Sequence, residues 1–179
     1  MRWLSTCLIV LLGSTILVFG QEQHQHQPDP GECAKLPADL KAIVTAMDGP
    51  GRKLEAQTAR TEMSSLSPAL QCLDVALHPI DRVSLTATSK TAEKVEGTFA
   101  GLLFFSVLQD GNYRVSTDTA LWIDMLDKDK ALERTKLNRR VQCGRVHKSI
   151  GFALKSGVNY WLQLSGSKGR EVQVLITSE

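Results

Sequence analysis

From Leu70 onward, apolar residues recur at every second position, which is the spacing of a β-strand with one buried face. This alternation predicts strands in LDVAL (73–77), RVSLTA (82–87), NYRVST (112–117), ALWIDML (120–126), SIGFALK (149–155), NYWLQLSG (159–166) and EVQVLIT (171–177). FAGLLFFSV (99–107) is apolar on both faces, as a central strand would be. The turn sequences QDGN, KSGV and GSKG separate several of these segments. Short strands without intervening helices predict a mostly β fold, an antiparallel β-sandwich of the jelly-roll type.

Helical spacing is strongest near the start of this region, in LPADLKAIVTAM (36–47). Pro37 is tolerated in a first helical turn, and DGPG (48–51) ends the pattern, so we expect one short N-terminal helix. KALERTKLNRR (130–140) is compatible with a turn or two of helix, and residues 51–66 give no firm prediction.

The first residues have the features of a secretory signal peptide. Arg2 precedes the apolar run CLIVLLGSTILVF, and Val18 and Gly20 are small enough for a cleavage site. We therefore expect a signal peptide over 1–20, a disordered tether over 21–34 and a single sandwich domain over 35–179, in a periplasmic or secreted protein. The alternative is an uncleaved N-terminal anchor. No later apolar run is long enough for a second span, so we expect no stable membrane span after cleavage.

The formal net charge of +2 gives no electrostatic reason to expect a nucleic-acid partner or an anionic membrane surface. The chain contains no G-x-S-x-G, no H-E-x-x-H and no glycine-rich phosphate loop. We therefore assign no catalytic residue and no cofactor, and we favour a non-enzyme.

Two tryptophans are candidate ligand contacts. In ALWIDML, Trp122 shares a strand face with Asp124, whereas Ile123 and Met125 point the other way. If the aliphatic face is inward, Trp122 and Asp124 form an outer pair that suits a sugar ring or a partner protein. Trp161 lies beside Gln163 in the same way. The alternative is a Trp packed under a loop or at the edge of the sandwich.

Metal binding is the second possibility to weigh. Asp124, Asp127 and Asp129 lack the spacing of a calcium loop and alternate with lysines, so a solvated strand edge is favoured. His24 and His26 form an H-x-H pair in the Gln-rich tether, and two imidazoles bind copper or zinc loosely. The alternative is a plain soluble linker.

Three cysteines remain after the expected cleavage, namely Cys33, Cys72 and Cys143. An exported domain can form one disulfide and keep one free thiol. Cys72 belongs to an alternating strand, whereas the other two lie in loop-like contexts, so we predict a Cys33–Cys143 bond with Cys72 free and buried. A Cys33–Cys72 bond would close a shorter loop and remains the alternative.

The last part of the chain resembles a group of short exported bacterial proteins of uncertain function. The shared pattern is G-x-L-x-F-x-V…G-x-Y-R-V, W-I-D-V/M, C-x-x-I/V-x-K and F-x-L…G-x-Y-x-L-Q-L-x-G. It is carried here by Gly101, Leu103, Phe105, Val107, Gly111, Tyr113, Arg114, Val115, Trp122, Ile123, Asp124, Cys143, Val146, Lys148, Phe152, Leu154, Gly157, Tyr160, Leu162, Gln163, Leu164 and Gly166. Some proteins of this group carry the label homogentisate 1,2-dioxygenase, which implies an iron enzyme. The Y-R-V and Y-x-L-Q-L segments are also similar to bacterial pre-peptidase C-terminal sandwich domains.

Three functions stay open from the sequence. The leading one is an exported, non-catalytic sandwich that binds a partner protein, glycan or envelope component through an exposed face, with at least one of Trp122 and Trp161 exposed. The second is a copper- or zinc-handling protein that uses His24 and His26. The third is an enzyme of the dioxygenase type, which the resemblance implies without supplying a catalytic residue.

Overall fold

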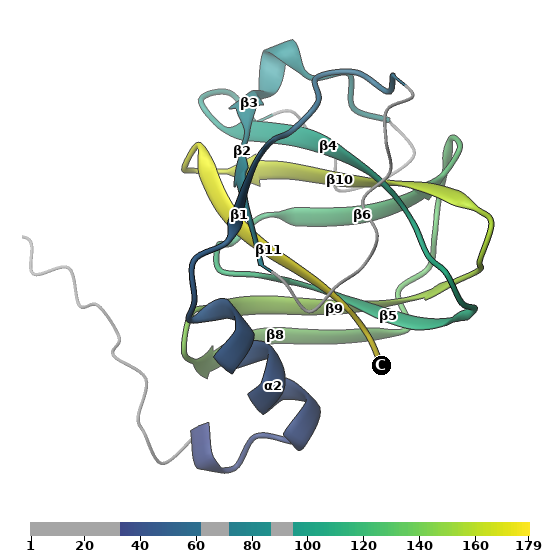
Figure 1. Cartoon of the computed structure of the whole chain (residues 1–179). Coiled ribbons are helices and arrows are strands. Elements are labelled where there is room, and N and C mark those ends of the chain that lie inside the picture. The colour runs from purple at the N-terminus through teal and green to yellow at the C-terminus, as the bar shows by residue number, and fades with distance from the viewer. Residues whose placement is uncertain (1–32, 62–71, 87–94) are drawn as a thin grey trace, which may run out of the picture.

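The computed structural model describes residues 33–61, 72–86 and 95–179, which form two packed β-sheets and a helix (Figure 1). The six-stranded sheet has the order β1 (Arg52–Glu55), β2 (Leu73–Ala76), β11 (Glu171–Ser178), β5 (Gly111–Thr117), β9 (Val146–Leu154), β8 (Lys136–Cys143). The five-stranded sheet has the order β3 (His78–Pro79), β4 (Phe99–Ser106), β10 (Asn159–Ser167), β6 (Trp122–Asp127), β7 (Lys130–Ala131). Neighbouring strands are antiparallel except β1 and β2. The predicted β-sandwich with a short helix is confirmed.

The main hydrophobic core lies between the two sheets. Every second residue of each strand points into it, so Val115 and Phe152 of one sheet meet Phe105 and Leu162 of the other. The rings of Phe105 and Tyr160 lie 5.9 Å apart in this layer. The strand periodicity read from the sequence therefore selects the residues that hold the two sheets together.

Each sheet also has an apolar cover on part of its outer face. The helix α2 (Ala38–Met47) packs Leu40, Ile43 and Met47 onto the six-stranded sheet, against Val146 and Leu175. A 3-10 turn, η1 (Ile80–Arg82), and the residues after it cover part of the five-stranded sheet. The predicted helix over 36–47 is confirmed, with its start at Ala38 directly after Pro37.

Two sequence expectations about secondary structure are wrong. RVSLTA is not a strand within its described residues, because η1 leads into irregular chain whose Ser84 nitrogen donates to the oxygen of Thr58, 2.7 Å away. Its alternating Val83 and Leu85 still pack on the sheet face beneath them, which explains the misleading pattern. KALERTKLNRR forms β7 and most of β8 instead of a helical turn, because pairing of β8 with β9 outweighs its local helix preference.

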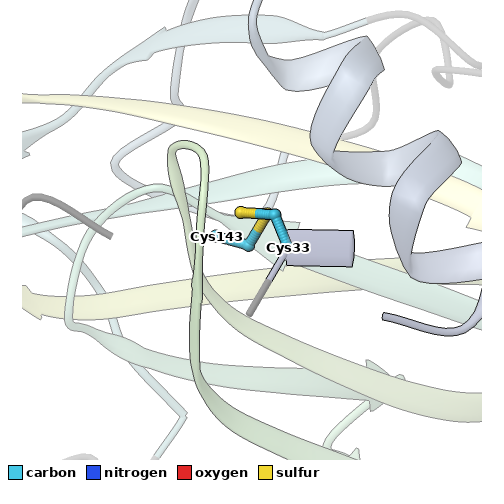
Figure 2. Close-up of a disulfide and its surroundings, with 2 residues drawn as sticks. All are labelled: Cys33 and Cys143. Carbon is cyan, nitrogen blue, oxygen red and sulfur yellow. A yellow bond between two sulfur atoms is a disulfide. The ribbon is translucent and has the colours of Figure 1, made fainter. Parts of the chain in front are cut away.

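The disulfide joins Cys33 to Cys143, across 110 residues of sequence (Figure 2). The pairing is as predicted and ties the chain ahead of α2 to the six-stranded sheet, but Cys143 is the last residue of β8 and not a loop residue. Cys72 is free and buried, also as predicted, but it lies under α2, where its thiol donates to the oxygen of Ala46.

The predicted signal peptide over 1–20 and nearly all of the predicted tether over 21–34 lie outside the described residues. Among the described helices, none has the length and apolar character needed to cross a membrane.

Candidate functional site

The candidate residues of the sequence analysis lie on the outer face of the five-stranded sheet. In β6, Ile123 and Met125 point into the core, so Trp122 and Asp124 face outward. On the neighbouring strand β10, Trp161 and Gln163 also face outward. The register places Ser165 opposite Trp122, Gln163 opposite Asp124 and Trp161 opposite Leu126. The structure thus brings all three predicted contacts to one face.

Trp122 is the exposed member of this set, with 40% of its surface accessible. Its indole lies over Gly166, where an added Cβ would come within 3.3 Å of the ring. Gly166 has a φ of 77°, in the left-handed region that favours glycine, and the pairing of β10 with β4 shifts register there. The bulge therefore makes the space that the Trp122 ring occupies.

Lys148 reaches the same indole from the other sheet. Its ammonium lies 5.4 Å from the centre of the Trp122 ring and donates to the backbone oxygen of Leu121. A cation over an aromatic ring is attracted by the negative face of the ring. Lys148 and Gly166 together hold an exposed aromatic side chain in one orientation.

Asp124 is oriented outward as expected, but it is not an open carboxylate beside the tryptophan. Only 6% of its surface is accessible, and its Oδ1 lies 3.2 Å from the guanidinium of Arg134. The same Arg134 nitrogen donates to the oxygen of Ile123. Asp124 therefore supports Arg134, a half-buried cation that the sequence analysis did not single out.

Trp161 is buried, with 8% of its surface accessible. Its ring lies 4.8 Å from that of Phe104, and Val83 and Leu126 pack in the same cluster. The packed alternative considered from the sequence is correct for Trp161, whereas the exposed alternative is correct for Trp122.

Between the two tryptophans, the sheet carries buried polar groups without partners. Gln163 accepts a hydrogen bond at Oε1 from the nitrogen of Thr86, at 2.8 Å. Within the described residues, the Gln163 amide nitrogen and the hydroxyls of Ser165 and Thr86 have no hydrogen-bond partner. Buried polar groups are usually satisfied, so these three mark a polar patch on this sheet face, in which Ser165 lies directly opposite Trp122.

The possible metal ligands do not gather into a site. Asp129 pairs with Arg60 at 2.5 Å, whereas Asp124 pairs with Arg134. Across residues 33–61, 72–86 and 95–179, no three His, Cys, Asp or Glu side chains are placed to hold a metal ion together. His24 and His26 lie outside the described residues.

A polar groove of about 500 Å³ on the six-stranded sheet was missed by the sequence analysis. Its side chains come from strands that are far apart in the sequence, including β1, β2 and β11. Which of these segments lie side by side depends on strand pairing, which local spacing along the sequence does not show. Comparisons of this chain with protein-family models, curated proteins and solved structures found no match.

Proposed function

We propose that this chain is an exported, non-catalytic binding module that holds a glycan against Trp122. The observation that carries the proposal is the large aromatic ring of Trp122, which is 40% accessible, with the Lys148 ammonium 5.4 Å from the ring centre and Gly166 beside its Cδ1–Nε1 edge. A flat indole offers apolar area at little entropic cost, which suits the C–H face of a sugar ring.

The surroundings of Trp122 supply the polar side of such a contact. Arg134 is anchored by Asp124 and keeps 28% of its side chain accessible. Guanidinium and ammonium groups donate hydrogen bonds to sugar hydroxyls and to acidic sugars, and fixed donors lose little freedom on binding. Arg134 and Lys148 therefore set the orientation of a sugar that Trp122 holds by stacking.

Export is the second part of the proposal. The signal-peptide features of residues 1–20 support it, and the Cys33–Cys143 bond supports a compartment outside the reducing cytoplasm. Envelope glycans are abundant in such compartments, which favours a glycan over the other partners considered from the sequence. A signal-peptide cleavage product starting near Gln21, found by N-terminal sequencing of the exported protein, would support this part.

Glycan-array binding tests the ligand part, followed by titration of the best glycan while tryptophan fluorescence is recorded. We expect binding that quenches or shifts Trp122 emission and that is lost in Trp122→Ala. The matched control is Trp161→Phe, which alters a buried ring that no ligand can reach. A glycan that binds Trp122→Ala as tightly as the native protein would refute the proposal, as would an array without any bound glycan.

A further inference from the structure

The polar groove on the outer face of the six-stranded sheet lies beside α2, on the opposite side of the sandwich from Trp122. Strands β1, β2 and β11 run next to one another there (Figure 1). The charged residues of the lining are Lys53, Glu55, Asp74, Asp118, Arg145, Arg170 and Glu171. A volume of about 500 Å³ is in the range of small-molecule sites in proteins.

The floor of the groove is formed by Asp74, Asp118 and Gln173, with Gln173 hydrogen-bonded to both carboxylates. The strand register places Lys53, Asp74 and Gln173 directly opposite one another. Asp74 accepts hydrogen bonds from the Gly51 nitrogen at 3.1 Å and from the Gln173 amide nitrogen at 3.2 Å. Asp118 accepts from the Gln173 backbone nitrogen at 2.9 Å. These bonds hold both carboxylates in place, with acceptor capacity left over.

Gln173 supplies an independent observation that points to a ligand. Its side chain is 3% accessible, and its amide nitrogen is committed to Gly49 and Asp74. Within the described residues, its amide oxygen has no donor. A buried acceptor without a donor is costly, and Gln173 is hydrogen-bonded to the carboxylates of both Asp74 and Asp118, so this floor favours a group that carries several N–H donors.

The rim of the groove carries cations that are not tightly engaged. Arg145 comes only within 3.9 Å of Asp118, and 54% of its side chain is accessible. Lys53 and Arg170 are exposed and make no side-chain ion pair or hydrogen bond with the described residues. Guanidinium groups bind carboxylates and phosphates with paired hydrogen bonds, so this rim favours an anionic group.

We propose that the groove binds a small zwitterion of amino-acid or dipeptide size, with its ammonium on the Asp74–Gln173–Asp118 floor and its carboxylate at the Arg145 and Arg170 rim. The lining contains no aromatic side chain, which distinguishes it from the Trp122 surface. The groove shares no residue with the Trp122 surface, which is formed by Trp122, Arg134, Lys148 and Gly166.

The experiment is an NMR titration of isotope-labelled protein with alanyl-alanine. Three probes serve as comparisons: N-acetyl-alanyl-alanine, which lacks the ammonium; alanyl-alanine amide, which lacks the carboxylate; and a neutral disaccharide. We expect shifts at groove residues with the free dipeptide. Each blocked dipeptide should bind about tenfold to a hundredfold more weakly, because each loses hydrogen bonds to charged groups.

Exposed rim residues provide variants that leave the fold intact. Arg145→Ala and Arg170→Ala should each weaken alanyl-alanine binding, whereas Arg82→Ala, an exposed arginine at η1, should leave it unchanged. Trp122→Ala should also leave it unchanged, so failure of the glycan proposal would not affect this result. Absence of shifts at saturating dipeptide, equal binding of the blocked dipeptides, or preference for the disaccharide would overturn the proposal.

Discussion

The guanidinium of Arg114 binds one carboxylate oxygen of Glu179 through two nitrogens, with Nε at 2.7 Å and Nη2 at 2.6 Å. Arg114 is on the outer face of β5 and only 3% accessible, and its Nη2 also lies 2.9 Å from Asp39 in α2. Lys136 of β8 approaches the second oxygen of Glu179 at 3.1 Å. This cluster links the residue after β11 to β5, to β8 and to the first turn of the helix.

Replacement of Glu179 by Gln should change the pH dependence of stability. Burial raises the pKa of the Glu179 carboxyl, but hydrogen bonds and positive charge from Arg114 and Lys136 together hold it below its ordinary value of 4.5. The ionised group therefore stabilises the folded state above pH 4.5, and that contribution is lost as the pH falls through the lowered folded-state value.

We expect urea unfolding of Glu179→Gln to show a lower free energy of unfolding at neutral pH and a shallower loss on acidification. The matched control is Glu133→Gln, which changes an exposed glutamate. Identical acid slopes for Glu179→Gln and the native protein would contradict the assignment.

Loss of the disulfide should lower stability without changing the fold. A bond that spans 110 residues of sequence restricts the unfolded chain strongly. The chain-entropy model gives about 5 kcal/mol for a loop of this size. We expect the double variant Cys33→Ser/Cys143→Ser to unfold at correspondingly lower denaturant with similar strand content by circular dichroism. Peptide mapping without reductant that found Cys72 in a cross-linked peptide would contradict the pairing.

Cys72 should react with thiol reagents only when the protein opens. Burial raises the pKa of its thiol, and the nearby charges of Asp74 and Asp118 add to this effect against the opposing charge of Arg145. The thiolate is the reactive form, so both burial and the raised pKa slow alkylation. We expect iodoacetamide to label Cys72 in urea and not under native conditions, as followed by mass spectrometry. Rapid labelling of the native protein would show that α2 does not cover the thiol.

The sequence predicted well those features that depend on alternation along one strand. Alternation placed Ile123 and Met125 on the strand face opposite Trp122, because strand geometry alone separates the two sets. Which of the two faces is buried stayed open until the structure showed the aliphatic one in the core. The cysteine pairing was also predicted, although the stated reason was incomplete. Cys72 is excluded from the bond by its place under α2, and the sequence pattern had placed it in a strand.

Apart from the disulfide, features that depend on contacts between distant segments were not predicted. The pairing of Lys53, Asp74 and Gln173 requires the register of three strands, one of them parallel to its neighbour. The commitment of Asp124 to Arg134 likewise depends on the path of the irregular segment between β7 and β8. Local spacing indicates which face a residue occupies, but it does not indicate which residue of another strand lies beside it.

Collisional quenching should separate the two tryptophans of the described chain. Trp122 is 40% accessible and Trp161 is 8% accessible, so acrylamide should quench the first much more strongly. In protein that lacks residues 1–20, Trp161→Phe leaves Trp122 as the emitter and Trp122→Phe leaves Trp161. We expect a steep quenching slope and red-shifted emission for the former, and a shallow slope with blue-shifted emission for the latter. Equal slopes would contradict the arrangement of this sheet face.

Substitution of Gly166 by Ala tests whether the bulge in β10 positions Trp122. The backbone φ of 77° is unfavourable for any residue with a Cβ, which costs roughly 1–2 kcal/mol. The added Cβ would also lie 3.3 Å from the indole, so the ring must shift. We expect a lower free energy of unfolding together with a changed Trp122 emission, measured in the Trp161→Phe background.

Gly157→Ala is the matched control, because Gly157 has a similar φ of 73° but no atom within 4 Å of the added Cβ. It should lose comparable stability and leave Trp122 emission unchanged. If both variants change the emission equally, the effect comes from general destabilisation and Gly166 does not position the ring.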